Sequence, residues 1–298
     1  MYHLTDRVRK CSGLFVLLAI QLTLSSVAAA VLDTNEPTNG TKLHQRAKRA
    51  VDVDDLYGRI STEDLLQQIR NEPYIVQLIE GFVNTYNKMK ENGEQNSPVV
   101  IKLAQFVRET LNMPNLNMVD QRILGQLLML RDELPRSIKN AVFAQRVCFR
   151  NVENDEYLIS PSQAYLYDLE RRRVFTWIPG GRPRDNFGSW ELTFQGNDVF
   201  IRNFRTRENM YAPANIYKYD SDRRRVFTWT QDWIQIGGSG LWKLEPEGDN
   251  VNIKSAAYPE YLYAAGDGFN HDNDRRSVYT WGPGDKISNG LWEIEDCT

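Results

Sequence analysis

A seven-residue motif that occurs three times constrains the fold of this chain more than any other feature. RRRVFTW occupies residues 171–177 and 223–229, and RRSVYTW occupies residues 275–281, so successive copies start 52 residues apart. The β-branched and aromatic residues of the motif favour a β-strand. A fixed interval of about 50 residues predicts three copies of one small structural unit.

Further residues recur in the same register. The clearest are the tryptophans of GSWEL, GLWKL and GLWEI, which are Trp190, Trp242 and Trp292. Each unit then contains four short strands, which in the first unit lie near Val147, at YLIS, at VFTW and at SWEL. Three such units resemble a β-trefoil, in which six strands form a barrel and three hairpins cap it, whereas a propeller normally needs at least four blades. We expect the three tryptophans to be core residues.

The residues before the repeats have a different periodicity. Between about 61 and 145, apolar residues recur at the spacing of amphipathic helices. We expect five short helices, which begin at Ser61, Pro73 and Ser97 or span 118–133 and 136–145. The predicted fold class is an α+β multidomain chain: a small all-α helical domain, residues 50–145, followed by a three-repeat β-trefoil, residues 146–298.

The first 30 residues have the pattern of a secretory signal peptide. Lys10 precedes the apolar run LFVLLAIQLTLSSVAAA, and the small residues at its end suit signal-peptidase cleavage after Ala30. No later segment is long and apolar enough to span a membrane. We therefore expect a secreted, extracellular protein without a membrane span.

A second processing signal follows the signal peptide. Arg46, Lys48 and Arg49 match the R-x-K-R form that furin-type convertases read, so we expect residues 31–49 to be a propeptide and a convertase to be a partner. This segment contains the chain's one glycosylation sequon, at Asn39. Cleavage after Arg49 leaves 29 basic (36 − 7) and 36 acidic (39 − 3) residues, a net charge of −7. That balance argues against a nucleic-acid partner.

Two of the three cysteines remain after this processing. Cys11 lies in the signal peptide, whereas Cys148 and Cys297 lie near the two ends of the repeat region. An even number of cysteines in an oxidising compartment predicts one disulfide. In a β-trefoil the first and last strands are neighbours, which would bring these two sulfurs together. Two free buried thiols are the alternative.

The basic triplets admit three interpretations, because acidic residues precede each of them in DLERRR, DSDRRR and DNDRRS. The first is a turn followed by a strand, with arginine stems covering aromatic faces. The second is a threefold face that binds sulfated sugar, phosphate or an acidic partner. Its members would be Arg171, Arg172, Arg173, Arg223, Arg224, Arg225, Arg275 and Arg276. The third is a metal site, which adjacent arginines oppose, and we assign no metal.

Two loops depart from the threefold pattern and are further candidates for ligand binding. The loop WIPGGRPR at 177–184 contains Trp177, Arg182 and Arg184. The loop DWIQIGGSG at 232–240 contains Trp233, which has no counterpart in the other repeats. A specific site is expected where the symmetry of such a fold is broken.

The sequence gives little support for catalysis. No nucleophile–base signature and no phosphate-binding glycine loop is present. His271 is the one histidine left after processing, and it lies in the polar loop GFNHDND. We therefore assign no catalytic residues and no cofactor, and we expect that the protein is not an enzyme.

Three stretches carry a resemblance to a known family. They are SWEL at 189–192, NDVFIRN at 197–203, and Asn209-Met210-Tyr211 before VFTW. Together with the helical first half they resemble the microvitellogenin-like, low-molecular-weight haemolymph lipoproteins of moths. The resemblance implies a helical domain joined to a β-trefoil, secretion into haemolymph, a storage role, and binding of lipid or sugar. The RAKR site departs from the family pattern.

A ricin-type galactose site is not expected, because the second strands YLIS, MYAP and YLYA lack the sugar-binding aspartate of ricin-type lectins. The hypothesis from sequence is a secreted, non-enzymatic binding protein. Its β-trefoil would bind a carbohydrate, a lipid or another extracellular ligand, with a glycan, lipid or protein as partner. A haemolymph storage protein and a secreted hydrolase are the alternatives.

Overall fold

A computed structural model describes residues 81, 83–84, 86–112, 121–161, 167–168, 170–182, 186–229, 232 and 236–298. The chain divides into two compact units, residues 1–84 with 109–127 and residues 85–108 with 128–298. All contacts discussed below lie within the second unit. The signal peptide, Ala30, the propeptide with Asn39 and RAKR, and the helix expected at Ser61 lie outside the described residues. The domain bounds given above stay a prediction.

The described helices follow the sequence pattern closely. Residues 86–91 are helical, and the chain leaves this helix at Gly93, whose φ of 71° is one that glycine adopts without strain. Ser97 begins the next helix, because its Oγ accepts a hydrogen bond from the N–H of Val99 at 3.3 Å. The described helices with assigned bounds are η1 (Glu94–Asn96), α6 (Val99–Leu111), α7 (Gln121–Glu133) and α8 (Arg136–Phe143).

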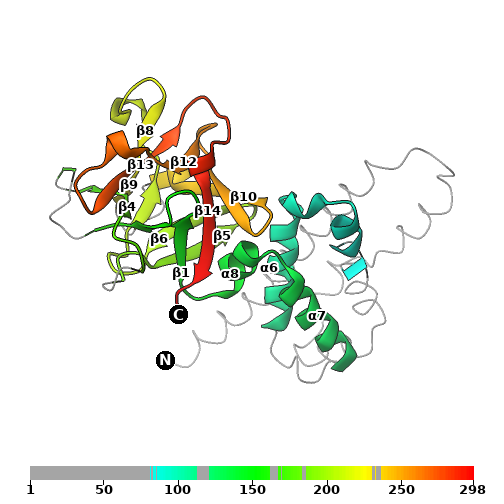
Figure 1. The fold of residues 1–298 in the computed structure, drawn as a ribbon. Coiled ribbons are helices and arrows are strands. Elements are labelled where there is room, and N and C mark those ends of the chain that lie inside the picture. Colours follow the sequence, from blue (N-terminus) through cyan, green and yellow to red (C-terminus); the bar gives the residue numbers. More distant parts are fainter. Residues whose placement is uncertain are drawn as a thin grey trace, which may run out of the picture. The chain divides into compact units, whose positions relative to one another are not determined.

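From Val147 onward the structure consists mainly of strands (Figure 1). The first repeat contains β1 (Val147–Asn151), β2 (Glu156–Ile159), β3 (Arg172–Arg173), β4 (Phe175–Trp177) and β5 (Trp190–Gln195). The second contains β6 (Asp198–Asn203), β7 (Asn209–Tyr211), β8 (Arg223–Arg225), β9 (Phe227–Trp229) and β10 (Leu241–Glu247). The third contains β11 (Asn250–Ser255), β12 (Tyr261–Ala264), β13 (Arg275–Trp281) and β14 (Leu291–Asp296).

The third strand of the first two repeats is divided: the strand predicted at VFTW is preceded by a short additional strand within the arginine triplet. The breaks fall at Val174 and Val226, whereas β13 continues through the equivalent Val278. The N–H of Val174 donates to the carbonyl of Val226 at 3.2 Å. The backbone at the break therefore bonds to the corresponding residue of another repeat.

The first and last strands of the three repeats form a closed ring. β1 pairs with β5, β5 with β6, β6 with β10, β10 with β11, β11 with β14, and β14 with β1. The other strands form three hairpins, β2–β4, β7–β9 and β12–β13. A closed six-stranded barrel with three hairpins is a β-trefoil, which confirms this part of the predicted fold.

Three tryptophans connect the barrel to the hairpins. Trp190, Trp242 and Trp292 are each 0% exposed. Each indole N–H donates a 3.0 Å hydrogen bond to a carbonyl of the second strand of its repeat, at Leu158, Met210 and Leu262. A buried indole needs such an acceptor, and the predicted core role of these residues is confirmed.

Helix α8 lies against the last strand, β14 (Figure 1). The backbone of Ile294 bonds to two side chains of α8: its N–H donates to Ser137 Oγ at 2.9 Å, and its carbonyl accepts from Asn140 Nδ2 at 2.8 Å. Ser137 also donates to the carbonyl of Asp249 at 2.5 Å. The helix thus satisfies backbone groups at a strand edge that would otherwise be buried without partners.

A disulfide joins Cys148 of β1 to Cys297, directly after β14. Their Cα atoms are 5.7 Å apart and 149 residues apart in sequence. The two strands are antiparallel neighbours, with Cys148 opposite Glu295. The bond therefore connects the first and last strands of the ring, as predicted.

Removing this disulfide is expected to destabilise the β-trefoil. Because the bond closes a long loop, the substitutions C148A and C297A together should lower the free energy of unfolding by about 2–5 kcal/mol. Urea titration followed by tryptophan fluorescence measures the change. Unchanged stability, or two alkylatable thiols in the native secreted protein, would contradict the assignment.

Candidate functional site

The arginine triplets lie where the three repeats meet. β3 pairs with β9, β8 with β13, and β13 with β4, so the motif of each repeat pairs with that of another. The third residue of each triplet lies opposite an aromatic residue; the pairs are Arg173 with Phe227, Arg225 with Tyr279, and Ser277 with Phe175. These three strand pairs form a pseudo-threefold cap, and the three triplet positions have different environments within it.

The middle arginine of each triplet forms an ion pair with a glutamate of another repeat. Arg224 donates to both carboxylate oxygens of Glu260, at 2.7 and 2.8 Å, and the two side chains are 2% and 5% exposed. The other two pairs are Arg172 with Glu208 at 2.8 Å and Arg276 with Glu156 at 2.9 Å. These arginines are therefore largely covered by protein, as Arg224 shows most clearly.

A threonine completes each of these pairs. Thr176, Thr228 and Thr280, of the VFTW and VYTW segments, donate to Glu156, Glu208 and Glu260 respectively. Arg224 and Arg276 also donate to the backbone carbonyls of Pro213 and Ala265. Burial raises the pKa of Glu260, but the bonds from Arg224 and Thr280 outweigh it and the pKa is lowered. The carboxylate thus stays charged inside the protein.

The first arginine of each triplet is held by the acidic residue three positions before it. The ion pairs are Arg171 with Asp168, Arg223 with Asp220, and Arg275 with Asp272. Each guanidinium also lies over the tryptophan of another repeat, at 5.3 Å for Trp229, 5.7 Å for Trp281 and 5.8 Å for Trp177. This agrees with the interpretation in which arginine stems and heads cover aromatic rings.

The third position differs, because it carries Arg173, Arg225 and Ser277. Neither Arg173 nor Arg225 lies within 4.0 Å of a carboxylate oxygen among the residues that the structure describes. Arg173 contacts the third repeat, with Nη2 donating to Ser277 Oγ at 3.4 Å and Nη1 lying 3.3 Å from His271 Nδ1. Arg225 donates from Nη1 to the carbonyl of Lys218 at 3.1 Å.

Aromatic rings surround these two arginines. The guanidinium of Arg225 lies 5.5 Å from the ring centre of Tyr167 and 5.3 Å from that of Tyr219. These tyrosines are 44% and 48% exposed. Each contacts a buried aromatic residue in a tilted geometry: the ring centre of Tyr167 lies 4.9 Å from that of Phe227, and that of Tyr219 lies 5.3 Å from that of Tyr279. Within the third repeat the equivalent ring is His271, 5.0 Å from Phe175.

The electrostatics of this region reflect its positive charge. Burial lowers the pKa of Arg173, and the charge of Arg225 lowers it further. The pKa of His271 is lowered first by burial and then by Arg173, against a smaller opposing effect of Asp272. The group of Arg173, Arg225, Tyr167, Tyr219, His271 and Ser277 is called the axial cluster below.

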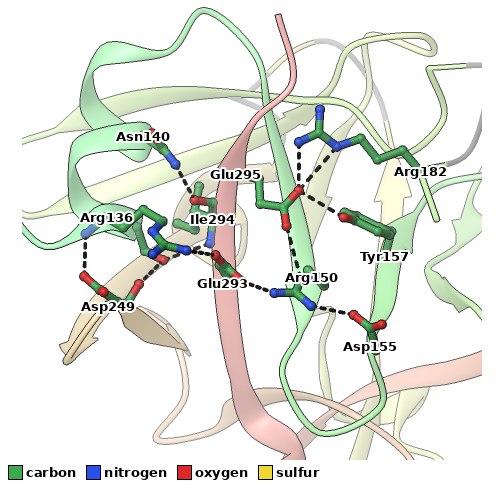
Figure 2. Close-up of polar contacts among 11 residues, drawn as sticks. Arg136, Asn140, Arg150, Asp155, Tyr157, Arg182, Asp249, Glu293, Ile294 and Glu295 are labelled. Atoms are coloured by element: carbon green, nitrogen blue, oxygen red, sulfur yellow. Dashed lines mark hydrogen bonds and ion pairs between the residues drawn. The ribbon is translucent and has the colours of Figure 1, made fainter. Parts of the chain in front are cut away.

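The loop at 177–182 is anchored by an ion pair of Arg182. Arg182 lies 2.8 Å from Glu295 Oε2, which also accepts from the hydroxyl of Tyr157 at 3.0 Å (Figure 2). Figure 2 also shows Arg150 reaching both Glu293 and Glu295 on β14. Arg182 thus connects its loop to the last strand. Arg184 and Trp233 lie outside the described residues.

The described part of the chain contains no cluster of three or more histidine, cysteine, aspartate or glutamate side chains that could hold a metal ion. Among its described helices, none has the length and apolar character needed to cross a membrane.

Comparison with known proteins adds little to these observations. No protein-family model and no curated protein matches the chain. Solved structures that are similar include a Culex quinquefasciatus salivary protein of the cysteine- and tryptophan-rich family, with 22% identity, TM-score 0.39, and coverage of 52% of this chain and 94% of that one. The designed threefold-symmetric protein ThreeFoil is 12% identical, with TM-score 0.41 and coverage of 51% of this chain and 99% of that one. A ricin B-like lectin of Macrolepiota procera in complex with lactose is 12% identical, with TM-score 0.38 and coverage of 51% of this chain and 95% of that one. Nothing in these comparisons shows the resemblance to moth haemolymph lipoproteins.

The glutamates that bind the middle arginines were not among the residues predicted from the sequence. Glu156, Glu208 and Glu260 are also 52 residues apart, so the repeat itself carried a signal that could have found them. The sequence also did not show that the three positions of a triplet have different roles, because all three are arginines in two of the repeats and their partners lie in other repeats. The exposed tyrosines of the axial cluster, Tyr167 and Tyr219, were not singled out as site residues.

Breaking one of the buried pairs should be costly. Arg224→Ala leaves Glu260 as a buried, unpaired carboxylate, so we expect a loss of about 3–5 kcal/mol in the free energy of unfolding. The double substitution R224M/E260L, which removes both charges, should lose much less. Arg182→Ala is the control: its arginine is half exposed, and we expect about 0–1 kcal/mol. Chemical denaturation measures all three, and equal losses for R224A and R182A would refute the assignment.

The lowered pKa of His271 predicts a pH dependence. As pH falls through the unfolded value of about 6.5, the unfolded chain takes up a proton that folded His271 resists, so stability declines. Carboxylates with a lowered pKa, such as Asp272, change the stability of the protein only at about pH 4 and below. Between about pH 6.5 and 5, the variant H271N should therefore show a flatter dependence of the unfolding midpoint on pH. Identical slopes would contradict the expectation.

Proposed function

We propose that this protein is a secreted, non-enzymatic binding protein and that it binds its ligand on the pseudo-threefold cap of the β-trefoil. The observation that carries the proposal is the axial cluster. Six of the eight triplet arginines form ion pairs with carboxylates. Arg173 and Arg225 have no carboxylate partner among the described residues, and Arg225 lies beside the exposed Tyr167 and Tyr219. Tyrosine and arginine together are typical of binding surfaces.

Two features support an extracellular location. The signal-peptide pattern before Ala30 predicts secretion, and a structural disulfide such as Cys148–Cys297 is typical of proteins from oxidising compartments. Cleavage after RAKR, with a furin-type convertase as the partner, belongs to the same proposal.

The ligand class follows from the chemistry of the surface. Tyrosine rings stack against sugars and lipid-like groups, and arginine adds charged hydrogen bonds, so a carbohydrate or a polar lipid suits the cap better than a purely apolar ligand. A storage protein is the second candidate. It needs no such surface, and it would be distinguished by great abundance at one developmental stage.

The test uses protein secreted from cultured cells. N-terminal sequencing should give Ala50 as the first residue, and an intact Val31 would contradict the propeptide. The same protein is then applied to glycan and lipid arrays and assayed on generic ester, peptide and glycoside substrates. Selective binding without turnover supports the proposal. Turnover, or an absence of binding on both arrays, would overturn it.

A further inference from the structure

We propose that the axial cluster is a site for a tetrahedral oxyanion, a sulfate or phosphate ester, held between Arg173 and Arg225. This inference rests on the proposed function and specifies the chemistry that the cap recognises. It is carried by four observations: the missing counter-charges, the contacts that aim the two arginines, the serine that replaces a third arginine, and the tyrosine rim.

The first observation is the contrast in charge pairing. Every first and middle arginine of the triplets forms an ion pair with an aspartate or glutamate. The third arginines do not, among the described residues. Two arginines that repel each other without a carboxylate between them favour an external anion.

The second observation is how the arginines are held. Arg173 contacts Phe175 by its guanidinium at 5.0 Å and reaches Ser277 and His271 of the third repeat. Arg225 is fixed between Tyr167 and Tyr219. Both side chains are thus positioned before a ligand arrives, which reduces the entropy lost on binding. A planar guanidinium with several N–H groups matches the oxygens of sulfate or phosphate.

The third observation is the break in symmetry at Ser277. An arginine there would place a third positive charge among the other two, whereas Ser277 is a short, buried side chain whose hydroxyl accepts from Arg173 and helps to position it. The hydroxyls of the half-exposed Tyr167 and Tyr219 add donors at the rim. The cluster therefore offers donors of both charged and neutral kinds to one tetrahedral group.

The overall charge limits the size of the ligand. The processed chain has a net charge of −7, which repels long polyanions. A short sulfated oligosaccharide or a single phosphorylated headgroup needs only the local positive field of the cluster. Both carry the same oxyanion chemistry, and the experiment below separates them.

The experiment measures binding to the secreted protein by calorimetry at fixed ionic strength. The probes are a heparin-derived tetrasaccharide, its desulfated form, and phosphatidylcholine vesicles with and without phosphatidylinositol phosphate, with inorganic phosphate as competitor. We expect R173Q/R225Q to weaken binding by at least about tenfold, because charged hydrogen bonds are lost. The matched control K88Q/R205Q removes two exposed charges elsewhere and should bind as the parent does. R173K/R225K keeps the two positive charges but loses the planar guanidinium groups, so its affinity should lie between those of the parent and R173Q/R225Q.

The outcomes separate this inference from the proposed function. Binding of the tetrasaccharide but not of its desulfated form, weakened in R173Q/R225Q, supports the site with a sulfated glycan as the source. Binding of phosphoinositide vesicles alone, weakened in the same way, supports it with a phosphate headgroup. Unchanged binding in a folded R173Q/R225Q, or no binding of any probe, overturns the site. If the arrays still identify a ligand in that case, the binding function stands and only the oxyanion site fails.

Discussion

Three buried bridges between repeats hold the cap of this protein together. In each, an arginine of one repeat and a threonine of another both donate to a glutamate of the threonine's own repeat, as Arg224 and Thr280 donate to Glu260. Such a bridge adds little net stability when it replaces a good apolar contact, but breaking one member is costly. Its main effect here is to specify which strand lies next to which.

Because these bridges occupy the middle position of the triplet, the positions on either side can differ. The first arginine packs on a tryptophan and bonds to an aspartate, which stabilises the turn before the strand. The third position lies beside exposed rings, as Arg225 does beside Tyr167 and Tyr219. In a triplet of three arginines, the first therefore stabilises the turn, the second forms the buried bridge, and the third carries a charge beside the exposed rings.

The sequence predicted the β-trefoil, the core tryptophans and the cysteine pair because each of these depends on the 52-residue repeat or on the strand order that it implies. It could not assign the arginines, because local spacing says nothing about partners from another repeat: Arg276 binds Glu156, which lies 120 residues earlier. The axial cluster was hidden for the same reason. Arg173 meets Ser277 and His271 only after three repeats have closed into a ring.

The cyclic order of the bridges also sets how many repeats the fold needs. The arginine of the first repeat binds the second, that of the second binds the third, and that of the third returns to the first. A chain of one or two repeats would bury an arginine at one end and a glutamate at the other, each without its partner. In this cyclic arrangement, three repeats pair every arginine with a glutamate, whether the repeats lie on one chain or on three. A single repeat is therefore incomplete, and a trimer of single repeats would restore all three pairs.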